Sequence, residues 1–111
     1  MRFIPQSLHG VADYLVGIGM IFLAFLSGAE GPIVWIFLLL GIFAIVYSLV
    51  TDYPLGWKPL LTMPTHLAVD AGFAVVMLAL PLIFSMPVLL VWVSLGIGVA
   101  AAFLVATTRM K

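Results

Sequence analysis

Four apolar stretches of about 20 residues each dominate this sequence, and each is long enough to cross a bilayer as a helix. They run from about 6 to 27, 32 to 50, 64 to 84 and 87 to 107. Each begins at or next to a proline, which suits the first turn of a helix because no hydrogen-bond partner is needed there. The sequence therefore predicts an all-α integral membrane protein, with four transmembrane helices in one membrane domain over residues 1–111.

The composition excludes a soluble domain and several functions. Hydrophobic residues make up 66% of the 111 residues, charged residues make up 7%, and the mean hydropathy is +1.38. A soluble chain of this length could not bury so much apolar surface, because small domains leave much of their area exposed. The sequence has no cysteine, which excludes disulfides and thiolate metal sites. Four bases balance four acids, so no basic patch is available to bind nucleic acid.

The basic residues predict the orientation in the membrane. Arg2 precedes the first stretch, Lys58 lies in the long middle connection, and Arg109 and Lys111 follow the last stretch. The other two connections carry no base. Lys and Arg are enriched in loops on the cytoplasmic side of a membrane. We therefore expect both termini and the middle connection to be cytoplasmic, in a bacterial inner membrane.

Two related pentapeptides stand at the beginnings of the first and third stretches. His9-Gly-Val-Ala-Asp13 and His66-Leu-Ala-Val-Asp70 contain both histidines and two of the four acids, at a spacing of 57 positions. Residues 40–42 and 95–97 also match as Leu-Gly-Ile, at a spacing of 55 positions. These matches predict a tandem duplication, with repeat 1 at about 5–52 and repeat 2 at about 63–109. Each repeat is a helical hairpin that starts on the same side of the membrane, so the repeats are parallel.

The pentapeptides predict one buried polar cluster. Residues four apart share a face of a helix, so His9 stacks with Asp13 and His66 with Asp70. A charged side chain at the bilayer centre costs about 2.5–3.5 kcal/mol on insertion scales, so such groups face the bundle interior and pair with one another. Because the first and third helices are parallel, both pairs lie at the same depth. We expect the four side chains to converge between these two helices.

Three interpretations of this cluster are compatible with the sequence. In the favoured one, the four side chains bond to one another and fasten the first helix to the third, since polar bonds help helices to associate in lipid. In the second, His9, Asp13, His66 and Asp70 are ligands of a divalent metal such as zinc, iron or manganese. In the third, they relay protons in a transporter or sensor. Haem between the histidines ranks last, because acids one turn away would crowd the porphyrin.

Other polar side chains near the cluster have simpler interpretations. Thr51 lies at the same end and is expected to initiate a turn, although it could reach the cluster. Tyr14 and Tyr47 could donate hydrogen bonds to it, but anchoring at the membrane interface is favoured for both. Tyr53 and Trp57 suit the headgroup zone, where amphipathic rings collect.

Motifs of common enzyme classes are absent from the sequence, which has no P-loop, dinucleotide fingerprint, GxSxG or HExxH. No Lys or Arg lies within a stretch to hold an anionic substrate. We therefore expect a non-enzymatic protein unless a metal or haem is bound. Its expected partners are the bilayer and either further copies of the chain or other subunits of a membrane complex. Small residues that would permit such packing are Gly17 and Gly19 in the first stretch and Ser94, Gly98 and Ala102 in the fourth.

The order of motifs also resembles a known family. A helix pair that opens with a His/Asp motif, passes a Leu-Pro segment and ends in a glycine-bearing helix is similar to the small SPW-repeat membrane proteins. The resemblance covers both halves. The family's Ser-Pro-Trp corresponds to Leu80-Pro81-Leu82 in the second half and to the region of Leu23-Ala24, without proline, in the first. The resemblance implies an architecture of repeated membrane hairpins and implies no activity.

Overall fold

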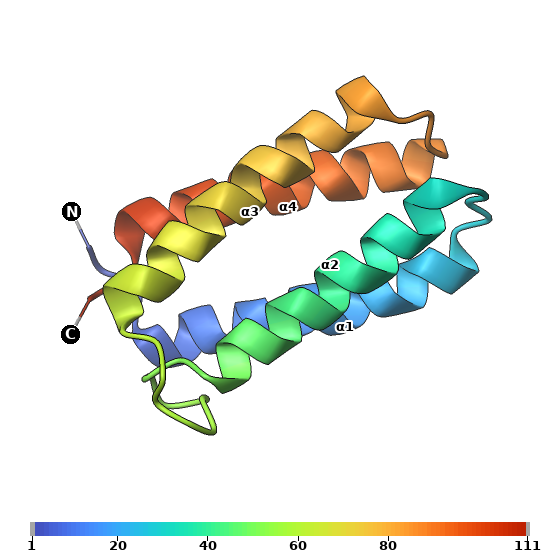
Figure 1. Ribbon diagram of the computed structural model, residues 1–111. Helices are drawn as coiled ribbons and strands as arrows, with labels where there is room; N and C mark the ends of the chain where they lie inside the picture. The colour runs from blue at the N-terminus through green and yellow to red at the C-terminus, as the bar shows by residue number, and fades with distance from the viewer. Residues whose placement is uncertain (1, 111) are drawn as a thin grey trace.

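The computed structural model describes residues 2–110, which form α1 (Gln6–Leu26), α2 (Pro32–Leu49), α3 (Met63–Ile83) and α4 (Val88–Thr107) (Figure 1). All four are long and apolar enough to cross a membrane, and residues 2–110 contain no β-strand. The predicted all-α membrane fold is confirmed, and each helix begins and ends within one residue of the predicted position. Lys111, one of the bases used to predict the orientation, lies outside the described residues.

The ends of the helices follow from proline, glycine and one threonine. Pro5 and Pro87 immediately precede α1 and α4, and Pro32 is the first residue of α2. The connection between α1 and α2 turns at Gly28 and Gly31, which have φ angles of 80° and 79°. Side chains with a Cβ rarely adopt such angles, so glycine suits this turn. At the start of α3, the Thr62 hydroxyl accepts a hydrogen bond from the backbone N–H of Thr65 at 3.3 Å.

The helices form two hairpins, α1 with α2 and α3 with α4, and the close packing is within each hairpin (Figure 1). A Cβ added to Gly41 would lie 2.7 Å from the carbonyl oxygen of Gly17, so these two glycines let α1 and α2 approach closely. In the second hairpin, a Cβ on Gly98 would lie 3.2 Å from the carbonyl oxygen of Ala74. The Ser94 hydroxyl donates to the carbonyl of Met77 at 2.6 Å. Gly17, Ser94 and Gly98 therefore pack inside the hairpins.

The start of each hairpin is hydrogen-bonded to the end of the other hairpin. The backbone N–H of Ile4 donates to the carbonyl of Thr107 at 2.9 Å, and that of Arg109 donates to the carbonyl of Ile4 at 3.0 Å. The same pattern recurs when each residue is replaced by the one 57 positions away, with the same donors and acceptors. In that second set, Leu61 N–H donates to Val50 O at 2.8 Å and Asp52 N–H donates to Leu61 O at 2.7 Å. The two sets of backbone hydrogen bonds between the hairpins are thus equivalent.

The glycines that pack in α2 and α4 are 57 positions apart, unlike the glycines of the 55-position match of residues 40–42 with 95–97. Gly41 and Gly98, 57 positions apart, both face the partner helix of their own hairpin. Among the described residues, none comes within 4 Å of a Cβ added to Gly96, the glycine that the 55-position match pairs with Gly41. The short Leu-Gly-Ile match is therefore displaced by two positions from the correspondence of the packed residues.

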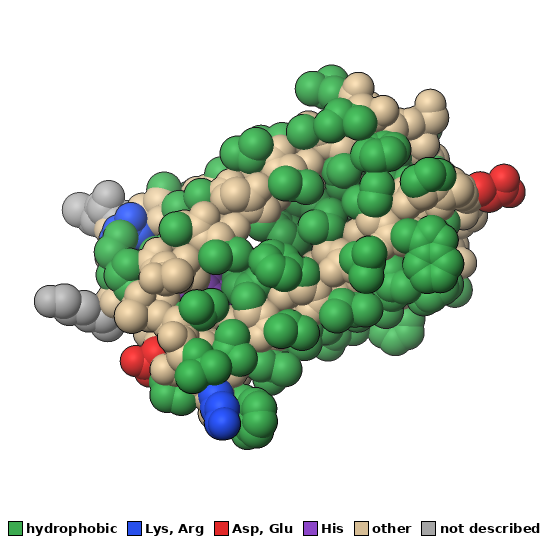
Figure 2. All heavy atoms as spheres, viewed as in Figure 1, with side chains coloured by type: hydrophobic (Ala, Val, Ile, Leu, Met, Phe, Trp, Pro, Cys, Tyr) green, Lys and Arg blue, Asp and Glu red, His purple; other side chains and the backbone are tan. Residues whose placement is uncertain are grey.

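The outer surface is apolar along the length of the helices, and the charged side chains lie at the two ends (Figure 2). Leu82 is 88% exposed and Trp92 is 70% exposed, as expected for side chains that face lipid rather than water. The long dimension of the molecule is 40 Å, enough to cross a hydrocarbon core of about 30 Å. Arg2, Lys58 and Arg109 all belong to segments at the end that carries both termini and the middle connection (Figure 1).

Candidate functional site

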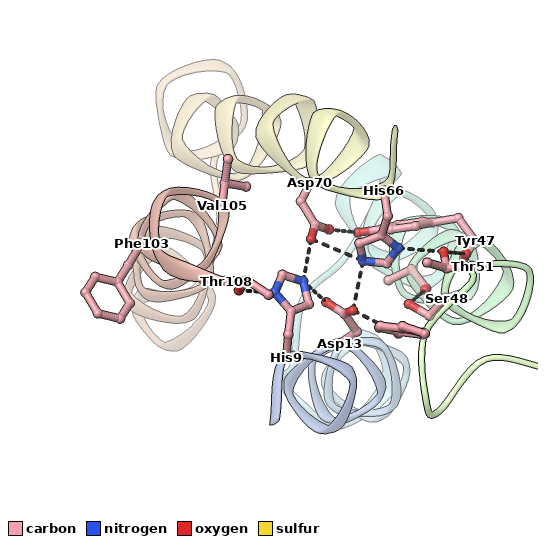
Figure 3. A network of polar contacts seen from close by, with 12 residues as sticks. His9, Asp13, Tyr47, Ser48, Thr51, His66, Asp70, Phe103, Val105 and Thr108 are labelled. Carbon is pink, nitrogen blue, oxygen red and sulfur yellow. Dashed lines mark hydrogen bonds and ion pairs between the residues drawn. The ribbon is translucent and has the colours of Figure 1, made fainter. Parts of the chain in front are cut away.

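His9, Asp13, His66 and Asp70 converge between α1 and α3, near the end that carries the termini (Figure 3). Both histidines are fully buried, and Asp13 and Asp70 are only 8% and 4% exposed. Each pair lies four residues apart on one helix, so both side chains of a pair point to the same side. The predicted buried His/Asp cluster is confirmed.

The shortest contacts in the cluster run between the two helices. His9 Nε2 lies 2.7 Å from Asp70 Oδ2, and His66 Nε2 lies 2.9 Å from Asp13 Oδ2. Within each helix, the Nε2 atom lies 3.2 Å from the carboxylate four residues later. The imidazole rings meet edge to face, with centroids 5.3 Å apart. The cluster therefore connects α1 to α3 reciprocally, each histidine contacting the aspartate of the other hairpin.

Each histidine is also held at its other ring nitrogen by a threonine. His66 Nδ1 lies 2.7 Å from Thr51 Oγ1, and His9 Nδ1 lies 2.7 Å from Thr108 Oγ1 (Figure 3). The Thr51 hydroxyl donates its only hydrogen to the carbonyl of Tyr47 at 2.6 Å. Thr51 must therefore accept the bond from His66, so the Nδ1 atom of His66 carries a proton.

The sequence prediction missed Thr108 and undervalued Thr51. These residues lie 57 positions apart, just past the ends of α4 and α2. If the two halves are aligned at 57 positions along their whole length, Thr51 is paired with Thr108. That alignment would have identified both threonines as partners of the cluster. The 55-position match in the second and fourth stretches concealed this correspondence. The expectation that Thr51 only initiates a turn is corrected by its contact with His66.

Two tyrosines donate hydrogen bonds to the carboxylates. The Tyr47 hydroxyl donates to Asp70, and the Tyr53 hydroxyl donates to Asp13 Oδ2 at 3.0 Å. The interpretation of Tyr47 as an interface anchor is wrong, since its hydroxyl is buried in the cluster. The Tyr53 hydroxyl is buried there too, while its place in the headgroup zone stays a prediction. Tyr14 instead donates to the carbonyl of Leu55 at 2.8 Å.

Tyr53 lies outside the helices, in the connection between α2 and α3. Burial raises the pKa of the Tyr53 hydroxyl above its ordinary value, and the Asp13 carboxylate raises that pKa further. Tyr53 therefore keeps its proton and is a hydrogen-bond donor to Asp13. No sequence signal marks this contact, because it depends on the path by which the connection folds back over the cluster.

Every buried side-chain nitrogen or oxygen within residues 2–110 has a hydrogen-bond partner. A small cavity of about 60 Å³ lies on the membrane side of the cluster, where Asp13, Tyr47 and Asp70 contribute its polar lining. On the other side, Tyr53 lines an open depression together with Asp52. The cluster thus separates a depression at the end of the molecule from a cavity between the hairpins.

Comparison with family models gives no match for this sequence, and comparison with curated proteins and with solved structures gives none either. The function is therefore inferred from the geometry of the site and from the membrane fold. Two imidazoles and two carboxylates in mutual contact can bond to one another, hold a cation or exchange protons.

Proposed function

We propose that this protein is a non-enzymatic integral membrane protein in which the His/Asp cluster fastens two helical hairpins together. The reciprocal contacts of His9 with Asp70 at 2.7 Å and of His66 with Asp13 at 2.9 Å carry the proposal. Helices in lipid gain little hydrophobic energy by associating, so close packing and polar bonds hold them together. The helix backbones approach most closely within each hairpin. Between the hairpins, apolar side chains such as Phe37 and Met77 share one core, to which the His/Asp cluster adds directed polar bonds.

A tandem duplication is the proposed origin of the two hairpins, as repeats at about 5–52 and 63–109. The equivalent backbone bonds at Ile4 and Leu61 support it, as do the equivalent contacts of Thr51 and Thr108 with the histidines. Chance similarity between two apolar sequences would not reproduce both sets of contacts at one spacing. The resemblance to SPW-repeat proteins stays a prediction.

The proposed location is a bacterial inner membrane with both termini in the cytoplasm. Arg2, Lys58 and Arg109 belong to segments at one end of the molecule, and Glu30 belongs to the turn at the other end. This distribution of bases agrees with the enrichment of Lys and Arg on the cytoplasmic side. The His/Asp cluster then lies close to the cytoplasmic surface.

A homo-oligomer or a place in a larger membrane complex is the proposed assembly. In α4 only 17% of the residues in the apolar stretch are buried, fewer than in the other helices, and Trp92 and Val99 on it are 70% and 63% exposed. This helix offers the largest face for another helix. Light scattering of the protein eluted in mild detergent tests the proposal, and a monomer at all concentrations would refute the homo-oligomer.

A double-mutant cycle tests the fastening role. His9→Ala, Asp70→Ala and the double variant are unfolded with a denaturing detergent in the presence of a chelator, and the free energy of unfolding is measured. We expect a coupling energy of about 0.6–1.7 kcal/mol, the range found for polar contacts between membrane helices. His9→Ala combined with Asp52→Ala is the matched control, since Asp52 is exposed at the same end of the molecule. Additive effects of His9→Ala and Asp70→Ala would contradict the proposal.

A further inference from the structure

We propose that His9, Asp13, His66 and Asp70 bind one divalent transition-metal ion, for which Zn²⁺ is the best fit. This inference deepens the proposed function, because the ion would fasten the same two hairpins. Hydrogen bonds alone would suffice for fastening, so metal binding is a separate property. Four features of the site support it.

The first feature is the donor set and its compactness. Each of the four residues offers one ligand atom, and these atoms all lie within 4.8 Å of one another. Zinc accepts imidazole nitrogen and carboxylate oxygen in tetrahedral geometry at about 2.0–2.2 Å, which places ligand atoms roughly 3.4 Å apart. The contacts of Nε2 with the carboxylates, 2.7 to 3.2 Å, therefore need to lengthen by roughly 0.2–0.7 Å, and wider pairs among the four ligand atoms need to shorten.

The second feature is the direction of the hydrogen bonds. Thr51 accepts from His66 Nδ1, because its own hydrogen is donated to the carbonyl of Tyr47. In the neutral ring, this leaves the Nε2 lone pair of His66 facing the Oδ2 atoms of Asp13 and Asp70. Lone pairs at these distances repel unless a proton or a cation lies between them. The site is therefore built to hold a positive charge at its centre.

The third feature is that every candidate ligand has an outer hydrogen-bond partner. Metal-binding histidines typically bond through their other ring nitrogen, and metal-binding carboxylates are typically hydrogen-bonded in turn. Both histidines bond a threonine hydroxyl through Nδ1, which leaves both Nε2 atoms directed inward. Both carboxylates accept from a tyrosine hydroxyl. These partners are Thr51, Thr108, Tyr47 and Tyr53.

The fourth feature is charge balance. Two carboxylates, two neutral imidazoles and one divalent cation have no net charge, which suits a site buried among membrane helices. The metal-free cluster reaches the same neutrality with one added proton on each imidazole. Binding is then an exchange, in which one divalent cation enters and two protons leave, and nothing is oxidised or reduced. The depression at the end of the molecule reaches Tyr53, which bonds Asp13, but none of the four ligands lines it.

Zinc loading of the purified protein tests the proposal. The protein in mild detergent is stripped with EDTA and dialysed against zinc chloride, and its metal content is measured by elemental analysis. We expect one zinc per chain in the wild type. Co²⁺ in place of zinc is expected to give the intense visible absorption of a four-coordinate site. Asp13→Asn and Asp70→Asn preserve side-chain size and should lose the bound zinc, whereas Asp52→Asn should keep it.

Two neighbouring threonines give a second pair of variants that leaves all four ligands in place. Thr108→Val removes the partner of His9 Nδ1, and we expect the zinc affinity to fall about 10–100-fold. Thr107→Val removes an exposed hydroxyl that bonds only its own helix, at Phe103, and should leave the affinity unchanged. These variants decide the question even where an aspartate variant fails to fold.

Absence of zinc from the reloaded wild type would overturn the inference, as would full zinc binding by both Asp13→Asn and Asp70→Asn. Equal affinities of Thr107→Val and Thr108→Val would overturn it as well. The fastening role is judged separately by the cycle between His9 and Asp70 in chelator. Coupling between His9 and Asp70 without zinc binding would support the fastening role and refute the zinc site. Zinc binding without coupling would support the zinc site and refute the fastening role.

Discussion

The glycines at the helix contacts give a prediction that distinguishes the two possible alignments of the hairpins. An alignment at 57 positions makes Gly98 the counterpart of Gly41, whereas an alignment at 55 positions makes Gly96 its counterpart. A Cβ on Gly98 would lie 2.7 Å from Leu78 Cγ, and none of the described residues lies within 4 Å of a Cβ on Gly96. We therefore expect Gly98→Ala to be the more destabilising of the two substitutions.

The size of the effect follows from which atom the new methyl group meets. In Gly41→Ala the methyl group would lie 2.7 Å from the backbone oxygen of Gly17, which moves only with α1 as a whole. Overpacking costs about 1–3 kcal/mol, and replacing glycine by alanine in a helix returns up to about 1 kcal/mol. A net loss of up to about 2 kcal/mol is expected for Gly41→Ala. Gly98→Ala should lose less, since the Leu78 side chain can move, and Gly96→Ala should lose nothing.

Unfolding by titration with a denaturing detergent, followed by circular dichroism, measures these differences in free energy. Gly19→Ala is the control for α1, because none of the described residues lies within 4 Å of a Cβ at that position. The expected order of stability loss is Gly41→Ala, then Gly98→Ala, then Gly96→Ala. A greater loss for Gly96→Ala than for Gly98→Ala would refute the 57-position alignment. Equal stability of Gly41→Ala and Gly19→Ala would refute the close-packing argument.

Two further predictions concern the cluster and the orientation. Tyr47→Phe removes the buried donor to Asp70 and should cost about 1–3 kcal/mol, whereas Tyr14→Phe, which removes an exposed bond to Leu55, should cost less in the same titration; equal costs would contradict the buried role of Tyr47. Because the chain has no cysteine, Glu30→Cys and Lys58→Cys can report the orientation. A membrane-impermeant thiol reagent added to intact bacterial cells should label Glu30→Cys and should label Lys58→Cys only after lysis, and the reverse pattern would contradict cytoplasmic termini.

The sequence predicts those parts of the structure that depend on one element at a time. Long apolar stretches can be satisfied in lipid only as helices, so their positions follow directly from the residue pattern. His9 and His66 stand out because polar residues are rare in such stretches, and their shared spacing from Asp13 and Asp70 places them together. The convergence of the cluster was therefore predictable without knowledge of any contact.

The outer partners of the cluster could not be predicted in the same way. Tyr53 reaches Asp13 only because residues 50–62 fold back over the end of the bundle, and no local pattern determines that path. Thr108 was missed because the sequence analysis relied on a three-residue match of frequent residues at 55 positions and did not compare Thr51 with Thr108, 57 positions away. In a membrane sequence, rare polar residues align repeats more reliably than frequent apolar ones.

The cluster is symmetric in its histidines, aspartates and threonines but not in its tyrosines. Positions 57 residues beyond Tyr47 and Tyr53 are Leu104 and Met110, neither of which can donate a hydrogen bond. Both hydroxyl donors to the carboxylates therefore come from the first half of the chain. Under the proposed duplication, two copies of the second half would keep the four central groups and lose both donors. The first half thus supplies the hydroxyl donors that the second half lacks. The two hairpins are therefore no longer interchangeable in the cluster, although each still provides one histidine and one aspartate.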